Sequence, residues 1–271
     1  MSGSQGAAPL HPVNAVTFDC WGTLISDRDL ERPSAVRIDA LVEASDGRLD
    51  RDEAQALFDR AWREHHTSWV GGIQYGSAGI ARFCVDELGA DDDLLCDRLQ
   101  EVFEEAGRHG TLFALDGAPE ALRTLREAGI RTALVCDTGL TPGRVVRDFL
   151  SDAGVLEHLE FCAFSDEVGE PKPNPGIFHA ALEAIGTRPE EAVHVGDLLR
   201  TDVEGARAIG MKTVRITAVN DDLATRFSWS PEASFGRTVA EGPHVDVEDA
   251  NVAISSHAEL AAALRKLGAQ I

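Results

Sequence analysis

Val16-Thr17-Phe18-Asp19-Cys20-Trp21-Gly22-Thr23-Leu24 decides the fold, because an apolar run rich in β-branched residues ends abruptly on a carboxylate and a glycine turn follows. Such a run predicts a buried strand of a parallel sheet with Asp19 at its carboxyl end. Open α/β sheets bind their ligands outside the carboxyl ends of the strands. The stretch therefore predicts that Asp19 lies in a functional crevice.

The composition is that of a globular protein with an acidic surface. The 271 residues are 44% hydrophobic and 26% charged, which suffices for one sizeable core and a smaller companion domain. The formal charge of −21 argues against nucleic acid or an anionic membrane as a partner, because either would be repelled. The acids are spread along the chain, which favours a solubilising or salt-adapted surface over an acidic tail.

Cysteine usage and the chain start predict a cytoplasmic location. Five cysteines, an odd number without C-x-x-C spacing, indicate reduced thiols. Residues Met1 to Leu10 contain neither a basic n-region nor an apolar h-region, and no later stretch is long enough to span a bilayer. The sequence leaves the oligomeric state open, with a homodimer as one option.

Short β-branched runs alternate with helical patterns along most of the chain. This alternation predicts an α/β fold, a Rossmann-like parallel sheet with helices on both faces. The expected strands are Ala15–Phe18, Arg131–Cys136, Glu160–Phe164, Ala192–Val195, Thr213–Ile216 and Asn251–Ile254. The expected helices are Pro119–Ala128, Pro142–Ala153, Pro175–Ile185, Asp202–Ile209 and His257–Leu267.

One segment breaks the alternation, since from about Asp29 to Arg108 only helical periodicity occurs. We expect a small all-helical cap domain over residues 27–108, inserted into a core domain formed by residues 1–26 and 109–271. Asn220–Asp249, polar and punctuated by Gly and Pro, is expected to be a long loop. The expected cap helices are Ser34–Glu43, Arg51–Trp69, Ser77–Leu88 and Asp92–Ala106.

Four groups of polar residues follow four predicted strands. Because a parallel sheet brings strand ends together, three carboxylates and one lysine should converge on one crevice. Each group alone is weak evidence: Asp202 by itself suggests a helix N-cap, and Lys172 could lie in a solvated loop. The ordered set is much more specific. It comprises Asp19, Val135–Gly139, Glu170–Pro175 and Val195–Asp202.

This ordered set resembles the haloacid dehalogenase (HAD) superfamily of hydrolases, over nearly the whole chain and including the helical insert. The stretches EPKPNPGIF, from Glu170, and VGDLLRTDVEGA, from Val195, carry the resemblance. It implies that Asp19 is the nucleophile and that Lys172 steadies it. It also implies that Asp197 and Asp202 are the acids of the last motif, and that Gly22 and Thr23 form the turn that holds the nucleophile.

The charges of these residues predict a metal. A carboxylate nucleophile forms a covalent ester or acyl phosphate that water then hydrolyses. Three acids against the single charge of Lys172 would raise one another's pKa values and weaken the nucleophile. Mg²⁺, which prefers oxygen ligands, relieves this repulsion. We expect Asp19, Asp197 and the backbone carbonyl of Trp21 to hold Mg²⁺, with Asp202 in support.

Trp21 departs from the phosphatase pattern of the superfamily. Phosphatases carry a second aspartate at this position to protonate the leaving alkoxide, and losing a general acid costs roughly 10²–10⁴ in rate. The 2-haloacid dehalogenases of the superfamily carry an aromatic residue there, and halide needs no proton. However, they work without metal and replace the acid at the Asp197 position. Schiff-base chemistry of the phosphonate hydrolase type is excluded, because no lysine precedes Lys172.

The second motif departs too. Cys136 stands where a Ser or Thr hydroxyl usually binds the substrate anion, Asp137 follows, and Thr138 is the substitute that we assign to the catalytic site. An inward Asp137 would repel a phosphate or carboxylate. An outward Asp137 that caps a turn is an equally good interpretation.

The predicted cap helix offers aromatic and titratable side chains. Phe58, Trp62, His66 and Trp69 recur at helical spacing, which is more typical of a cap core than of a substrate site. His66 or His65 is the candidate for a replacement acid, against the alternative of a structural or surface histidine. The residues assigned to substrate contact are Thr23, Cys136, Asp137, Trp62, Arg63 and His66.

The sequence thus favours a capped hydrolase that uses Mg²⁺ on a small phosphorylated metabolite. A metal-independent 2-haloacid dehalogenase is the first alternative. A metal-binding or regulatory module with feeble turnover is the second.

Overall fold

Six parallel strands form the central sheet of the computed structural model, which describes residues 11–219 and 249–271. The strand order is β5-β4-β1-β6-β7-β8, so that β1 pairs with β4 on one side and β6 on the other. Residues 1–10 and most of the loop expected over Asn220–Asp249 lie outside the described residues. The strands are β1 (Ala15–Phe18), β4 (Arg131–Cys136), β5 (Phe161–Phe164), β6 (Ala192–Gly196), β7 (Lys212–Ile216) and β8 (Val252–Ile254).

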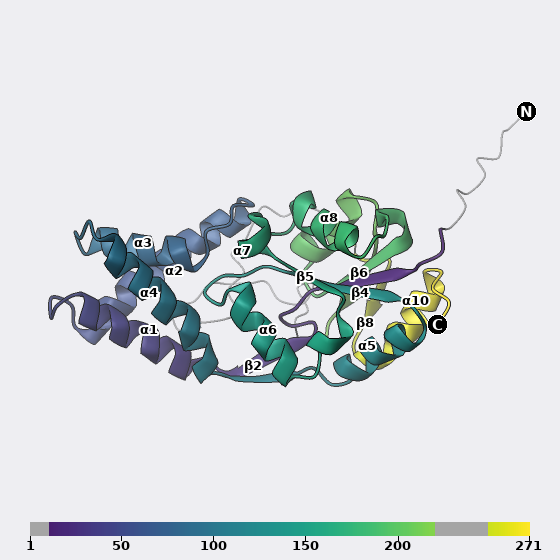
Figure 1. Ribbon diagram of the computed structural model, residues 1–271, viewed down its shortest axis with the longest axis horizontal. Coiled ribbons are helices and arrows are strands. Elements are labelled where there is room, and N and C mark those ends of the chain that lie inside the picture. Colours follow the sequence, from purple (N-terminus) through teal and green to yellow (C-terminus); the bar gives the residue numbers. More distant parts are fainter. Residues whose placement is uncertain (1–10, 220–248) are drawn as a thin grey trace, which may run out of the picture.

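Alternate side chains of the central strands enter two hydrophobic clusters, one on each face of the sheet. Val16 and Phe18 pack on one face, whereas Ala15 packs on the other. Figure 1 shows α8 on one side of the sheet and α5 and α6 on the opposite side. The predicted Rossmann-like fold is confirmed. The helices of this layer are α5 (Ala118–Glu127), α6 (Gly143–Asp152), α7 (Ser165–Val168), α8 (Pro175–Ala184), α9 (Glu204–Ala208) and α10 (Leu260–Lys266).

Four helices follow β1 and β2 and pack around a third hydrophobic cluster, apart from the sheet (Figure 1). They are α1 (Glu31–Ala44), α2 (Arg51–Val70), α3 (Gly76–Glu87) and α4 (Asp93–Glu105). The start of α2 is fixed by a capping box, in which Asp50 accepts from the Glu53 amide and Glu53 from the Asp50 amide. The expected all-helical insert is therefore present, and we call α1–α4 the cap.

Two short strands, which the sequence pattern did not predict, connect the cap to the sheet layer. β2 (Ile25–Asp29) and β3 (Thr111–Ala114) pair antiparallel, with a bulge near Asp27. β2 lacks the alternation that indicates a half-buried strand, because four of its five residues are polar or charged. The expected boundary between residues 26 and 27 falls inside β2, and the exact domain limits stay a prediction.

The segment after β6 also differs from the expected helix over Asp202–Ile209. The chain makes a wide π-helical turn, η4 (Leu199–Val203), before the short α9 begins at Glu204. This turn brings Asp202 back toward the strand end, where its carboxylate lies beside Gly196. Such irregular turns frequently occur at functional sites.

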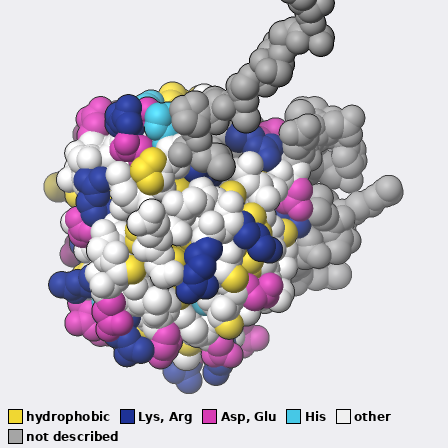
Figure 2. All heavy atoms as spheres, turned by 90° about the vertical axis from the view of Figure 1, so that its right-hand side faces the viewer, with side chains coloured by type: hydrophobic (Ala, Val, Ile, Leu, Met, Phe, Trp, Pro, Cys, Tyr) yellow, Lys and Arg dark blue, Asp and Glu magenta, His cyan; other side chains and the backbone are white. Residues whose placement is uncertain are grey.

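Acidic and basic side chains are interspersed on the face that Figure 2 shows, at the end of the molecule where α5 and α10 lie, and the yellow hydrophobic side chains are scattered. This distribution agrees with acids spread along the chain. None of the helices in residues 11–219 and 249–271 has the length and apolar character needed to cross a bilayer.

Candidate active site

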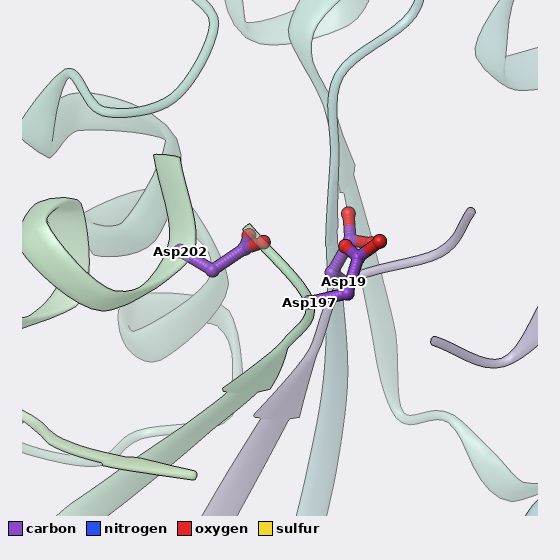
Figure 3. A group of neighbouring side chains, drawn as sticks. All are labelled: Asp19, Asp197 and Asp202. Atoms are coloured by element: carbon purple, nitrogen blue, oxygen red, sulfur yellow. The ribbon is translucent and has the colours of Figure 1, made fainter. Parts of the chain in front are cut away.

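Three buried carboxylates meet at the carboxyl edge of the sheet, as Figure 3 shows. Asp19 follows β1, Asp197 follows β6, and Asp202 reaches in from η4. One oxygen of each can be chosen so that all three lie within 4.8 Å of one another. The convergence predicted from strand ends is therefore present in the structure.

Lys172 forms ion pairs with two of these acids. Its Nζ lies 2.5 Å from Asp19 Oδ1 and 2.7 Å from Asp202 Oδ1, and its side chain is almost completely buried. The lysine stands in the Pro-rich loop that precedes α8, where Pro175 occupies the first helical turn. Lys172 therefore holds Asp19 and Asp202 in one charge-assisted network.

Asp202 is fixed by its neighbours on both oxygens. Its Oδ2 accepts the Leu198 amide hydrogen at 2.9 Å, and its Oδ1 lies 3.2 Å from His194 Nε2. Gly196 leaves the room for this, since a Cβ there would stand 2.3 Å from the Asp202 carboxyl carbon. With these partners and Lys172, Asp202 is better placed to position the lysine than to offer a free oxygen.

Within the cluster formed by the described residues, three carboxylates share the single positive charge of Lys172. Burial, together with the charge of Asp202, raises the pKa of Asp19 to about 7 despite the opposing effect of Lys172. Burial alone would lower the pKa of Lys172, but Asp19 and Asp202 raise it well above its usual range. For Asp202, Lys172 and His194 outweigh burial and hold the pKa below its usual range. An all-oxygen cluster with excess negative charge suits a hard divalent cation.

This imbalance predicts a pH dependence of the metal-free protein. Because the pKa of Asp19 is raised to about 7, folding binds its proton more tightly than the unfolded chain does. The stabilisation from this proton is complete below the unfolded pKa of about 4 and is lost as the pH rises toward 7, at roughly 1 kcal/mol per pH unit. As the pH rises from 4 to 7, the unsubstituted protein should therefore lose stability relative to Asp19→Asn, so that the difference in their free energies of unfolding shifts in favour of the variant. Urea unfolding in EDTA measures this difference, and parallel curves would contradict it.

Asp137 points into the site rather than outward. Its Oδ2 accepts the indole hydrogen of Trp69 at 2.7 Å, and its Oδ1 accepts the Lys172 amide hydrogen at 2.8 Å. The interpretation of Asp137 as an outward turn cap is therefore wrong, because the cap supplies a donor that holds the carboxylate inward. Burial raises the pKa of Asp137, while the charge of Lys172 opposes the rise.

Thr138 lies beside the site but its hydroxyl is already engaged. The hydroxyl donates to Asp166 Oδ1 at 2.9 Å and accepts from the Asp166 amide at 3.1 Å. The Thr138 amide donates to Ser165 Oγ at 2.8 Å. To bind a substrate anion, as proposed from the sequence, this hydroxyl would have to turn away from Asp166.

A cavity of about 370 Å³ lies between the cap and the carboxyl edge of the sheet. Trp62, His66 and Trp69 of α2 line it from the cap side, and Trp21 and Asp197 line it from the sheet side. Its other lining residues include Leu30, Pro33, Leu112, Leu140 and Phe149. The predicted cap residues Trp62 and His66 thus line the same cavity as Asp197, whereas Asp19 and Asp202 lie behind its wall and are not among the residues that line it.

Polar contacts tie the end of α2 to the loops around the acids. Besides the Trp69–Asp137 bond, the Asn174 side chain donates to the Gly72 carbonyl at 2.7 Å. The Arg200 guanidinium stacks on the Trp69 ring with its carbon 4.1 Å from the ring centroid. These contacts hold the cap against the loops that carry the acids.

The sequence model of the haloacid dehalogenase-like hydrolase family matches residues 13–210. The chain belongs to this family. A glyceraldehyde 3-phosphate phosphatase of Methanopyrus kandleri is 40% identical over 215 residues, which cover 75% of this chain and 84% of that protein. The haloacid dehalogenase-like hydrolase domain-containing protein 3 of Bos taurus is 35% identical over 112 residues, 41% of this chain. That alignment spans less than half, 43%, of the bovine protein.

Solved structures support the same fold. A 2-haloacid dehalogenase from Pseudomonas syringae superposes with a TM-score of 0.63 at 18% identity, covering 94% of this chain and 99% of that one. At this identity the likeness concerns the fold and not the reaction. The HAD-like hydrolase fold described above is thus shared by proteins named for phosphate esters and by one named for haloacids.

Three of the predicted substrate contacts do not reach the cavity of this HAD-like hydrolase. Thr23 and Cys136 are fully buried, and Cys136 belongs to the hydrophobic cluster under the sheet. The Thr23 carbonyl lies 2.7 Å from His257 Nε2, which anchors the turn after the nucleophile. Arg63 is exposed on α2, on a different side from Trp62.

The two histidines proposed as replacement acids are poor proton donors. Burial lowers the pKa of His65 to about 4. Burial and the charge of Arg200 also lower the pKa of His66, which lines the cavity. Both are therefore neutral at pH 7, so they can accept a proton but do not carry one to donate.

His194 is a site residue that sequence reasoning missed. It lies in the buried strand β6, where its Nδ1 stands 2.8 Å from Thr17 Oγ1 and its Nε2 faces Asp202. Burial lowers its pKa, which favours a neutral ring that can donate from Nε2. Its position inside the apolar run Ala192–Val195 could have indicated this role, because a buried polar side chain needs a hydrogen-bonding partner.

Proposed function

We propose that the chain is a Mg²⁺-dependent hydrolase of a small phosphorylated metabolite, with Asp19 as nucleophile. The observation that carries the proposal is Asp197, which adds a third carboxylate to Asp19 and Asp202 within 4.8 Å although Lys172 supplies only one positive charge. A reaction that needs no metal does not require this excess of negative charge over positive charge in the cluster. The phosphatase relative with 40% identity supports the same class of reaction.

In the proposed mechanism, the Asp19 carboxylate attacks phosphorus and the bond from phosphorus to the ester oxygen breaks, giving an acyl phosphate and the leaving alkoxide. Lys172 holds the Asp19 carboxylate in place through its Oδ1. Water then attacks the acyl phosphate, which releases inorganic phosphate and regenerates Asp19.

Asp19, Asp197 and the Trp21 carbonyl would hold Mg²⁺, with Asp202 in support. When bound, the cation neutralises charge on the carboxylates and on the phosphoryl oxygens. Because Trp21 has no proton to give and His65 and His66 are neutral at pH 7, substrates with leaving groups that need little protonation are favoured.

A 2-haloacid dehalogenase is the second candidate. Trp21 favours it, because an aromatic side chain at the cavity wall suits a leaving group that departs without a proton. In that case the Asp19 carboxylate displaces halide from carbon and forms an ester, which water hydrolyses.

A paired assay separates the candidates. Phosphate release from 4-nitrophenyl phosphate and halide release from 2-chloropropionate are measured with Mg²⁺ and with EDTA. Phosphate release that stops in EDTA supports the proposal, whereas halide release that resists EDTA overturns it in favour of the dehalogenase. Silence in both assays, together with calorimetric Mg²⁺ binding, favours a metal-binding module.

The variant Asp197→Asn tests the metal role directly. Replacing one carboxylate ligand with a neutral amide should weaken Mg²⁺ binding by at least the roughly 10–100-fold that is lost when only a hydrogen-bonding partner of a metal ligand is removed. Phosphatase activity should then recover in part at high Mg²⁺ concentration. The measurement is activity as a function of Mg²⁺ concentration, with the exposed Asp152→Asn as control. An unchanged half-saturating concentration speaks against Asp197 as a ligand.

A further inference from the structure

Arg37 of α1 is a buried cation at the cap side of the cavity. It is only 5% exposed, yet it lines the same cavity as Trp21 and Asp197. It lies between Pro33 and Leu41, which are buried on the same helix. The sequence pattern gave no reason to single out this arginine.

The guanidinium of Arg37 is only partly satisfied. Its Nε donates to the Phe103 carbonyl at 3.0 Å, which fixes the plane of the group against the end of α4. Among residues 11–219 and 249–271, no hydrogen bond or ion pair reaches either Nη atom. Neither Nη is among the buried polar atoms sealed from solvent, and Arg37 is one of the residues that line the cavity.

Four acids line the cavity, Asp27, Asp29, Asp137 and Asp197, and for two of them the contacts lie away from Arg37. Asp29 Oδ1 accepts the Glu31 amide at 3.1 Å, and its Oδ2 lies 3.7 Å from the exposed Arg32. Asp137 is held by Trp69 and by the Lys172 amide. Neither carboxylate is within ion-pair distance of Arg37.

An unpaired buried charge is costly to fold, because its desolvation is not repaid by a partner. Burial lowers the pKa of Arg37 to about 10, and no acid raises it again. Arg37 nevertheless stays charged at pH 7. A permanent cation that lines a cavity and keeps two donors without a partner among the described residues is a ready site for an anion.

We propose that Arg37 binds a carboxylate of the substrate, so that the substrate carries a phosphate at the acids and a carboxylate at the cap. This inference rests on the proposed function and names its substrate class. The Nε bond to Phe103 leaves the two Nη donors, which match the two oxygens of a carboxylate in one plane. Arg37 and Asp197 line one and the same cavity, which a substrate that contacts both of them requires.

A carboxylate fits better than a second phosphate. The cavity walls near Arg37 are apolar, with Leu30, Pro33 and Leu112 among them. Asp27, Asp29 and Asp137 also line the cavity, and they would repel a doubly charged group more than a singly charged one.

Calorimetric titration with non-hydrolysable ligands tests the proposal. In Mg²⁺ buffer, the protein should bind 3-phosphonopropionate about 10–100-fold more tightly than propylphosphonate, which lacks the carboxylate, as expected for hydrogen bonds to a charged group. Arg37→Met should remove this preference and leave the affinity for propylphosphonate unchanged. Arg37→Lys keeps the positive charge but lacks the two parallel N–H donors of the guanidinium, and it should retain part of the preference for 3-phosphonopropionate. Arg32→Met, on the exposed side of α1, is the matched control and should behave like the unsubstituted protein.

Each outcome decides a different point. Equal affinities for the two phosphonates, or a preference that survives Arg37→Met, overturn the Arg37 proposal and leave the proposed function intact. If propane-1,3-bisphosphonate binds more tightly than 3-phosphonopropionate and this depends on Arg37, the carboxylate proposal is overturned, and the group that Arg37 binds is a second phosphate. Arg37-dependent selectivity without phosphate release in the paired assay overturns the proposed function alone. If neither phosphonate binds, both proposals are overturned.

Discussion

Asp19→Asn is expected to abolish phosphate release, with kcat falling roughly 10⁴-fold or more, the scale seen when a nucleophile is removed. An amide nitrogen or oxygen cannot form the acyl phosphate that the proposed mechanism requires. Asp202 cannot take over, because its oxygens already accept from Lys172, His194 and the Leu198 amide. Steady-state phosphate release in Mg²⁺ measures the loss.

The stability of Asp19→Asn is measured as a control, to show that the variant is folded. Asn is nearly the same size as Asp, and metal-free Asp19→Asn should be at least as stable as the unsubstituted protein at pH 8, since the raised pKa of Asp19 shows that its charge is disfavoured there. An inactive but stable variant therefore assigns the loss to chemistry and not to unfolding. Activity within tenfold of the unsubstituted protein would rule out Asp19 as nucleophile. Trapping of acid-stable phosphoprotein in the unsubstituted protein, and its absence in the variant, gives an independent reading.

The sheet and its acids could be predicted because the relevant signals are local. β1 and β4 have the predicted bounds, Ala15–Phe18 and Arg131–Cys136, because each apolar run stops at an acid. Parallel pairing then brings Asp19 and Asp197 together without any further information. The excess of negative charge in the cluster could also be predicted, because three acids and one lysine follow the predicted strands.

The direction of Asp137 and the burial of Arg37 depend on how the cap packs against the sheet layer. No local sequence pattern predicts this packing. The inward direction of Asp137 is set by Trp69, which is 68 positions away in the sequence. Arg37 resembles a polar residue on an amphipathic helix, and only the end of α4 and the cavity wall reveal it as buried and half satisfied. Long-range contacts of this kind decide substrate choice, so they are what the sequence leaves out.

Trp21→Asp is expected to raise activity on alkyl phosphates. Trp21 lines the cavity two residues after Asp19, so a carboxyl group there would face the leaving oxygen. A positioned general acid contributes roughly 10²–10⁴-fold when the leaving group needs a proton. Hydrolysis of glycerol 3-phosphate should therefore gain by about this factor. Hydrolysis of 4-nitrophenyl phosphate, whose leaving group needs little protonation, should change much less.

The ratio of kcat/KM for these two substrates is the deciding measurement, because it cancels any general damage from losing the indole. Trp21→Asn supplies the matched control, since it has the same size as the aspartate but carries no proton to transfer. The gain should also disappear as the pH rises and the new carboxyl group ionises. Equal ratios for Trp21→Asp and Trp21→Asn would show that the missing proton donor does not limit this hydrolase.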